Sequence, residues 1–424
     1  MRKTLTILAL LSLSIPKCYS ADDGASVMTL HLEADDKLEQ FNLGESDSLV
    51  VTGTVSQEAL RVLGHCCVHQ PVSYNFSGSC IVGDSIPSET FCNLKDTMAS
   101  YARYVVLPEG LREIGDYAFW GNPNLAEVII PQSVERIGEA AFSQCGMTHI
   151  TLPSGLRELG AECFVRCRNL VTVDGSKAVG LKSIGRYCFF YCRSLVRLTL
   201  PDAVETIEGW ACYHCSSLAD VRLPASLHTI SMYAFTGCRQ LKDISFPQSL
   251  RHIGEGAFWD CDLHEIILPE GVRRVDAYAF HFNDNAKVVS LPSTLDSIDA
   301  ASFGFTHVSL EKFYCKRMTP PLLQHDWNPL WGYEEGSYPL TATLFVPIGA
   351  MAAYAADVYW SVFDTIEEIP SSEFPVPSAV SAPAVVPVAT DNAVYSLSGV
   401  CRSLGHGLNI VRMADGSVRK VVVK

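Results

Sequence analysis

One motif recurs nine times in the middle of this 424-residue chain, and it constrains the fold more than any other feature. The motif combines a Leu-Pro step, an Ile-Gly-like pair and an Ala-Phe pair, and it returns every 22–25 residues. Its prolines are Pro108, Pro131, Pro153, Pro201, Pro224, Pro247, Pro269 and Pro292, and the copy at Val173–Ser176 lacks one. A repeat of this length is typical of solenoids, in which each copy forms one coil of a stack.

A second marker keeps the same phase. A large residue recurs at Phe119, Phe142, Phe164, Phe189, Cys212, Phe235, Phe258, Phe280 and Phe303, and an aliphatic residue precedes each of them by five positions. In one copy, Leu195–Leu200 and Val204–Ile207 are predicted to be extended, and Gly209–Cys212 to form a helical turn. The apolar residues of a copy can be buried only against neighbouring copies. Each buried large aliphatic side chain then contributes about 1.5–3 kcal/mol.

The pattern L-x-x-I-x-L-P-x-x-L-x-x-I-G-x-x-A-F-x-x-C closely resembles the BspA-like leucine-rich repeat family. The resemblance covers residues 104–310 and extends through Ala342–Pro347 to Tyr354 and Trp360. It implies an α/β fold, a right-handed leucine-rich-repeat solenoid with parallel strands, about nine turns and a cap at each end. It also implies a bacterial cell-surface or secreted protein, with adhesion to host or neighbouring-cell proteins as the role of some members.

Composition and phase divide the chain into six predicted segments. These are a signal peptide (1–20), an N-terminal cap region (21–103), the solenoid (104–310), its C-terminal cap (311–370), a Pro/Ala/Ser linker (371–390) and a small β tail (391–424). The cap region is expected to contain a strand at Leu49–Val55 and a short helix at Gln57–Leu63. The tail resembles the C-terminal sorting tails of type IX secretion substrates. A sorting or anchoring role and a small β module without one both remain open.

The first twenty residues have the features of a secretory signal. A basic start at Arg2 and Lys3 precedes the apolar run Leu5–Ile15, and a cleavage site before Ala21 follows. Lipidation at Cys18 is the alternative. Removal of the signal changes the net charge from −14 to −17, which excludes nucleic acid as a favoured partner. No later segment is long and apolar enough to predict a transmembrane helix.

Most of the 16 cysteines follow the repeat. Three positions after the Phe marker come Asn122, Cys145, Cys167, Cys192, Cys215, Cys238, Cys261 and Asn283. This structural ladder predicts buried free thiols, with a disulfide or a metal site as the alternatives. Outside the repeat, the cluster at 65–69 leaves open a metal site or a disulfide among Cys66, Cys67, Cys80 and Cys92.

Aromatic residues recur beside the Ala-Phe pair. They lie two positions before the Phe marker or directly after it, so stacked coils would align them into stripes. The candidate binding stripe consists of Tyr187, Trp210, Tyr213, Tyr233 and Trp259. The other interpretation is that these rings only pack between adjacent coils.

The sequence predicts a protein that is not an enzyme. It contains no His-Glu-x-x-His, no phosphate-binding Gly-rich loop and no Gly-x-Ser-x-Gly, and the Gly-Asp-Ser at 83–85 has no Asp-x-x-His to supply a base. No cofactor or metal is expected. The predicted function is extracellular or cell-surface protein binding of an adhesin-like kind, and glycan binding or a purely structural surface role is the alternative.

We predict that the exported protein begins at Ala21. Mass determination of both ends after cell fractionation measures this directly. A mass that places a lipidated Cys18 at the N-terminus would contradict cleavage before Ala21, and a shortened C-terminus would indicate processing of the tail.

Overall fold

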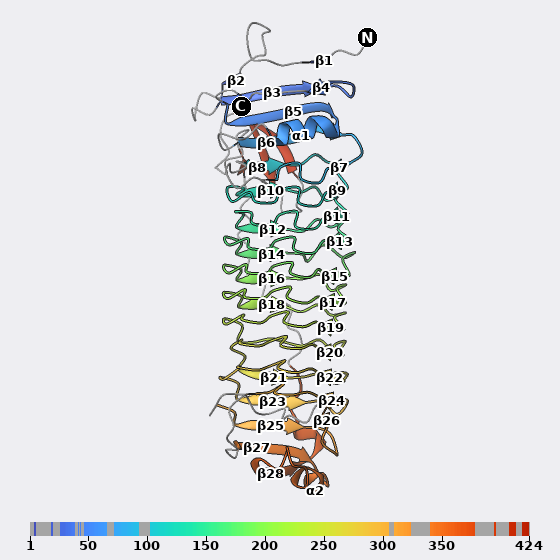
Figure 1. Ribbon diagram of the computed structural model, residues 1–424, viewed down its shortest axis with the longest axis vertical. Helices are drawn as coiled ribbons and strands as arrows, with labels where there is room; N and C mark the ends of the chain where they lie inside the picture. Colours follow the sequence, from blue (N-terminus) through green and yellow to red (C-terminus); the bar gives the residue numbers. More distant parts are fainter. Residues whose placement is uncertain are drawn as a thin grey trace. The chain divides into compact units, whose positions relative to one another are not determined.

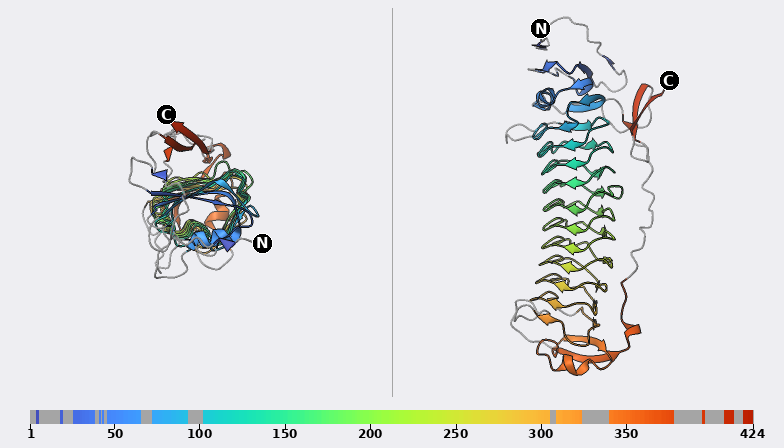
Figure 2. Two further views of the ribbon diagram at one scale, coloured as in Figure 1. Left: turned by 90° about the horizontal axis from the view of Figure 1, so that it is seen from above. Right: turned by 90° about the vertical axis from the view of Figure 1, so that its right-hand side faces the viewer.

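A computed structural model describes residues 4–5, 18–19, 26–38, 41, 43, 46–65, 72–92, 102–304, 309–323, 340–377, 394–395, 407–412 and 418–423. The chain divides into two compact units, residues 1–180 with 385–424 (unit 1) and residues 181–384 (unit 2). In each unit the strands lie side by side as the rungs of a parallel-strand β-solenoid (Figures 1 and 2).

Unit 1 contains two parallel sheets that run along its coils. One has the order β10-β8-β6-β5-β3, with β2 added antiparallel to β3, and the other has the order β13-β11-β9-β7. A separate parallel pair joins β1 to β4, and another joins β12 to β14. The elements are β1 Thr4–Leu5, β2 Cys18–Tyr19, β3 Ser26–Leu32, β4 Lys37–Leu38, β5 Ser48–Val55, α1 Gln57–His65, β6 Val72–Ile81, β7 Ser85–Ile86, β8 Ala102–Val106, β9 Glu113–Ile114, β10 Glu127–Ile129, β11 Arg136–Ile137, β12 His149–Thr151, β13 Glu158–Leu159 and β14 Thr172–Asp174.

Unit 2 repeats this arrangement. One parallel sheet has the order β15-β17-β19-β20-β22-β24-β26, another has the order β21-β23-β25-β27-β28, and β16 pairs with β18. The elements are β15 Ser183–Ile184, β16 Arg197–Thr199, β17 Thr206–Ile207, β18 Asp220–Arg222, β19 Thr229–Ile230, β20 His252–Ile253, β21 Glu265–Ile267, β22 Arg274–Val275, β23 Val288–Leu291, β24 Ser297–Ile298, β25 Lys312–Cys315, β26 Leu322–Leu323, β27 Leu340–Pro347, α2 Met351–Ala355, β28 Phe363–Ile369 and the 3-10 helix η1 Ser371–Glu373.

The solenoid has more turns than the nine predicted from the repeat. The strand and helix expected near residues 49–63 are confirmed as β5 and α1, but β3, β5 and β6 also pair in parallel with each other and with β8. At the other end, β25, β27 and β28 continue the parallel pairing. The two units together therefore contain about 13 turns. The extra turns were missed because their sequences lack the Leu-Pro and Ala-Phe markers.

One further coil, which contains Ile86 and Phe91, carries part of the motif but is not among the nine copies found in the sequence. Phe91 follows Ile86 by five residues, and Glu89 has the left-handed φ of 60° that recurs at this position in later coils. The amides of Glu89 and Phe91 donate to the carbonyls of Asp116 and Ala118, at 3.0 and 2.7 Å. The Ile-to-Phe spacing was the available signal, but Thr90 in place of Ala and the absence of Leu-Pro concealed it.

The Ala-Phe segment does not form the predicted helical turn. Its residues two before and two after the Phe marker have positive φ, for example 56° at Trp210 and 53° at His214. These left-handed residues alternate with residues of ordinary φ. As a result, every second amide of the turn donates to a carbonyl of the following coil. In the coil of Cys212, the amides of Trp210, Cys212 and His214 donate to the carbonyls of Met232, Ala234 and Thr236, at 3.0, 2.7 and 2.7 Å. A helix would direct these amides to carbonyls of their own coil.

Phenylalanine side chains stack through the interior of each unit. In unit 1, the rings of Phe91, Phe119, Phe142 and Phe164 lie 5.0, 5.2 and 5.7 Å apart and are nearly parallel. In unit 2, the rings of Phe235, Phe258, Phe280 and Phe303 lie 5.2, 5.4 and 5.3 Å apart. These side chains are fully buried, so the register between coils is fixed by the packing of large rings.

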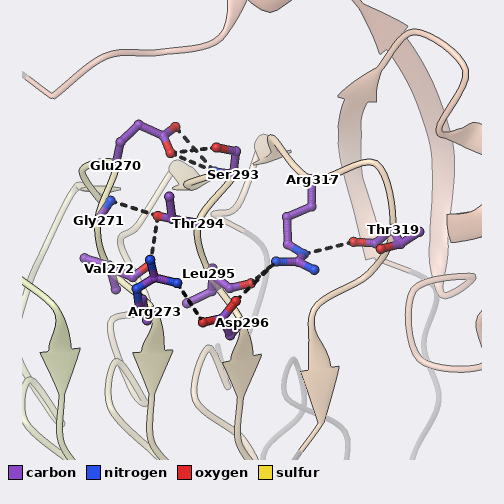
Figure 3. A network of polar contacts seen from close by, with 10 residues as sticks. All are labelled: Glu270, Gly271, Val272, Arg273, Ser293, Thr294, Leu295, Asp296, Arg317 and Thr319. Carbon is purple, nitrogen blue, oxygen red and sulfur yellow. Dashed lines mark hydrogen bonds and ion pairs between the residues drawn. The ribbon is translucent and has the colours of Figure 1, made fainter.

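Side chains also connect neighbouring coils at the Leu-Pro corner. The Thr294 hydroxyl accepts a hydrogen bond from the Gly271 amide at 2.8 Å and donates to the Val272 carbonyl at 3.0 Å (Figure 3). Arg273 pairs with Asp296 at 3.2 Å on the exposed surface. An exposed ion pair of this kind contributes about 0–1 kcal/mol, so it adds little to the burial of the core.

The segments after the solenoid have their own structure. Phe374, at the start of the predicted extended linker, is buried and its ring lies 6.1 Å from that of Tyr314. The tail forms an antiparallel sheet of β29 Val394–Tyr395, β30 Gly407–Arg412 and β31 Val418–Val423. Residues 378–393 lie outside the described residues.

Substitutions of Gln144, which has a φ of 59°, test whether the backbone of the turn is left-handed. We expect Gln144→Gly to be more stable than Gln144→Ala by about 1 kcal/mol, because a left-handed conformation costs an L-residue roughly 1–2 kcal/mol and glycine nothing. Urea unfolding of the two variants measures the difference. A helical turn gives the opposite order, with Ala more stable by about 0.5–1 kcal/mol.

Candidate functional site

The Cys/Asn ladder lies in the interior, beside the Ala-Phe turns. Each ladder thiol for which a contact is resolved donates to the carbonyl at the Phe marker of the preceding coil. The Sγ-to-oxygen distances are 3.1 Å for Cys145 to Phe119, 3.0 Å for Cys167 to Phe142, 3.1 Å for Cys215 to Phe189, 3.3 Å for Cys238 to Cys212 and 3.2 Å for Cys261 to Phe235. Cys192, the remaining ladder thiol, is also buried. The ladder therefore supplies donors to backbone carbonyls of the core.

At the two ends of the ladder, asparagine side chains also donate to backbone carbonyls. Their amide N–H groups are stronger donors than a thiol. The Asn122 amide donates at 2.7 Å to the carbonyls of both Phe91 and Phe119. The Asn283 amide donates to those of Phe258 and Phe280, at 2.8 and 2.9 Å. A carboxamide has two N–H donors, so it can reach its own coil and the preceding coil together.

Burial makes the ladder thiols chemically inert. It raises the pKa of Cys167 to about 12, and the pKa values of Cys145, Cys215 and Cys238 well above the ordinary range. A cysteine nucleophile or metal ligand must be a thiolate. Burial therefore disfavours both roles for these side chains.

The cluster near residues 65–69 lies only partly within the described structure. Cys66, Cys67 and His69 lie outside the described residues, whereas Cys80 is an exposed free thiol and the Cys92 thiol donates to the Glu89 carbonyl at 3.1 Å. Among the described residues, no group of three or more His, Cys, Asp or Glu side chains could hold a metal ion.

A continuous stack of aromatic rings runs over five coils of unit 2. We call it the aromatic array; it consists of Tyr187, Trp210, Tyr233, Trp259 and Tyr278. The centroids of successive rings lie 5.3, 5.6, 6.3 and 5.4 Å apart, within the range of favourable aromatic pairs. All five side chains are half-exposed. The coils therefore present a ribbon of ring edges on their surface.

The stack of rings continues through the coil in which glycine replaces the aromatic residue two positions before the Phe marker. Gly256 occupies the position that holds an aromatic residue in the coils on either side. A Cβ there would lie 2.5 Å from the Tyr233 ring. Trp259, three residues further along the same coil, contributes the ring between Tyr233 and Tyr278 instead. A glycine and a tryptophan from one coil thus together keep the stack continuous.

A second group of rings lies beside the first part of the array. Phe190 contacts Tyr187 edge to face at 5.2 Å and stacks on Tyr213 of the next coil, also at 5.2 Å. Tyr191 stacks on His214 at 5.1 Å. Burial lowers the pKa of His214, which favours its neutral form. A second set of ring contacts therefore joins the two coils that contain Tyr187 and Trp210.

Both interpretations of the aromatic stripe describe part of this geometry. The rings do pack between adjacent coils, because neighbouring rings cover their faces, yet their edges remain at the surface. Tyr233 also donates its hydroxyl to Glu255, and burial together with this hydrogen bond raises its pKa. A sugar ring stacks on an open aromatic face, and few such faces remain in the array.

The structure places Tyr187, Trp210, Tyr233 and Trp259 in one stack and Tyr213 in the group beside it. Sequence reasoning left Tyr278 out of the candidate stripe, although its repeat position was recognised. Tyr191 and His214 were missed. Both lie two positions after the Phe marker, where the left-handed turn recurs, and that position was not compared between copies.

A family model for the BspA type leucine rich repeat region matches residues 84–219 and 206–319 in six copies, which is more than half of the chain. The chain belongs to the BspA-type leucine-rich repeat family. No curated protein matches.

Several solved structures of leucine-rich repeat proteins resemble this BspA-type chain. A protein from Bacteroides ovatus is 16% identical, with 85% of this chain and 99% of that chain covered and a TM-score of 0.44. A leucine rich cell surface protein from Faecalibacterium prausnitzii is 19% identical, with 69% and 91% covered and a TM-score of 0.37. The pneumococcal vaccine antigen PcpA is 16% identical, with 82% and 85% covered and a TM-score of 0.37.

In the described part of this BspA-type protein, no helix combines the length and the apolar character needed to cross a membrane.

We predict that iodoacetamide modifies Cys80 in the native protein and leaves Cys167, Cys215 and Cys238 unmodified. Cys80 is exposed, whereas the other three are buried with raised pKa values. Peptide mapping by mass spectrometry, before and after denaturation, measures the difference. Equal native labelling of Cys80 and the three ladder cysteines would show that the ladder is not in the core.

Proposed function

We propose that this BspA-type protein is a non-enzymatic, adhesin-like protein of the cell surface or the extracellular medium, and that it binds another protein through the aromatic array. The continuity of the array across Gly256 carries the proposal. Packing within the Gly256 coil needs only a small residue beside Tyr233, whereas Trp259 extends the ribbon of rings to Tyr278. An array kept continuous at the surface is suited to contact with a partner.

The chemistry of the array favours a protein partner. Tyr and Trp are enriched in the energetic centres of protein interfaces, because they combine a large apolar area with a polar group and lose little side-chain entropy on binding. In the array, the stacked neighbours already hold each ring in place. Five coils about 4.8 Å apart span about 20 Å, which suits the centre of an interface of about 800 Å² per partner.

The proposed location follows from the family and from the first twenty residues. BspA-type repeats and a basic, apolar N-terminal segment together favour export. The inert ladder thiols are compatible with an oxidising exterior, because burial protects them from exchange. Glycan binding is the competing proposal, and the covered ring faces disfavour it.

The test is binding of the exported protein to immobilised extracellular matrix proteins, mucins and a glycan array. We expect saturable protein binding that Trp210→Ala with Trp259→Ala weakens at least about tenfold, because hot-spot side chains contribute about 2 kcal/mol or more. Trp120→Ala is the matched control, because Trp120 is a half-exposed tryptophan of unit 1, outside the array.

Two outcomes would contradict the proposal. Protein binding that the double Trp variant leaves unchanged would show that the array is not the binding surface. Glycan signals without any protein binding would favour the competing function.

A further inference from the structure

Two arginine side chains lie on the aromatic rings at one end of the array. Arg186 and Arg193 belong to the same coil and are exposed. The Arg186 guanidinium lies 4.8 Å from the Tyr187 centroid and 4.7 Å from the Trp210 centroid. The Arg193 guanidinium lies 5.1 Å from the Tyr191 centroid. One coil thus presents two cations near Phe190, whose ring lies 5.2 Å from that of Tyr187 and 4.6 Å from that of Tyr191.

These guanidinium groups differ from most others in unit 2. Among the described residues, neither has a carboxylate within ion-pair distance. Six other arginines of the unit each lie within 4.0 Å of an acidic side chain: Arg197, Arg222, Arg239, Arg273, Arg274 and Arg317. The guanidinium of Arg251 instead donates to backbone carbonyls.

The acidic groups beside the two cations are engaged elsewhere. The Glu208 carboxylate accepts the backbone amide of Arg186 at 3.2 Å. Asp260, which acts on the same His214 ring as Arg193, is held by two nitrogens of Arg239 at 2.9 and 2.8 Å. Glu208 keeps its negative charge, but the three cations named here, Arg186, Arg193 and Arg239, outnumber the two carboxylates of Glu208 and Asp260.

A stacked guanidinium is well prepared to bind a carboxylate. The contacts with the rings restrict the flexible side chain of each arginine. Arg186 also donates one N–H to the Tyr187 hydroxyl at 3.2 Å, and its other N–H donors can bind a ligand. Two parallel N–H groups then match the two oxygens of a carboxylate. The contact of Arg186 with two rings at once makes this effect strongest there.

We infer that the Arg186 and Arg193 end of the array binds an acidic segment of a partner protein, in which one or two carboxylates lie beside aromatic or aliphatic side chains. This inference rests on the proposed function and names the chemistry of the partner. The carboxylates bind the two guanidiniums, and the apolar side chains pack on Phe190 and Tyr213. The net charge of −14 disfavours a polyanion, because the chain as a whole would repel it.

The probes are three fluorescein-labelled synthetic peptides with the same aromatic and aliphatic residues. The alternate positions hold Glu in the first peptide, Gln in the second and Lys in the third. Fluorescence anisotropy with the exported protein at low salt measures their affinities. We expect the Glu peptide to bind at least about tenfold more tightly than the Gln peptide, with an affinity that falls as salt is added. The Lys peptide should bind most weakly.

Variants identify the groups responsible. Arg186→Gln with Arg193→Gln should reduce the affinity for the Glu peptide about tenfold or more and leave that for the Gln peptide unchanged. Arg186→Lys with Arg193→Lys keeps the charge, and should lose part of the affinity because an ammonium cannot form the planar paired contact. Arg197→Gln is the control, because its guanidinium pairs with Asp220 at 2.7 Å. Thermal unfolding confirms that each variant is folded.

The outcomes separate this inference from the function on which it rests. Equal binding of the Glu and Gln peptides, with loss of both in Trp210→Ala with Trp259→Ala, would overturn the inference and support the proposed function. A Glu peptide that does not bind, or that binds the double Arg variant equally well, would overturn it too. So would arginine-dependent binding of a sulfated oligosaccharide without binding of the Glu peptide.

Discussion

In most of the described Ala-Phe turns, the amides at alternate positions donate to the carbonyls of the following coil. For the coil of Phe235, these are the amides of Tyr233, Phe235 and Gly237, with distances of 2.7, 2.7 and 2.8 Å. A buried amide without a partner costs free energy comparable to a lost hydrogen bond. A single coil therefore cannot satisfy its own turn, and the repeat is stable only as a stack.

This backbone arrangement also determines which side chains can function. The left-handed residues Tyr187, Trp210, Tyr233 and Tyr278 recur at one position of the coil, so their rings come into contact as the coils stack. Backbone strain at each of them costs roughly 1–3 kcal/mol, which the hydrogen bonds and the buried Phe column offset. The proposed binding surface is thus a direct product of the turn that holds the solenoid together.

Much of this could be predicted from the sequence, because two periodic markers in phase leave few alternatives to a solenoid. The same phase placed Tyr187, Trp210 and Tyr233 in adjacent coils. The left-handed turn could not be predicted, because Trp, Tyr, Gln, His and other L-residues occupy most of its positions, and glycine, which would have marked it, occupies only a few, such as Gly237 and Gly256. The exchange of Gly256 for Trp259 within the array depends on packing in three dimensions. The flanking coils were missed because they carry at most part of the motif.

Native-state hydrogen exchange tests the connection between coils most directly. The account predicts that the amides of Cys212, His214 and Phe235 exchange orders of magnitude more slowly than those of Arg239 and Gln240, which lie in an exposed segment. Exchange of the first three at the rate of the exposed segment would show that the turns do not donate to their neighbours, and would contradict the account.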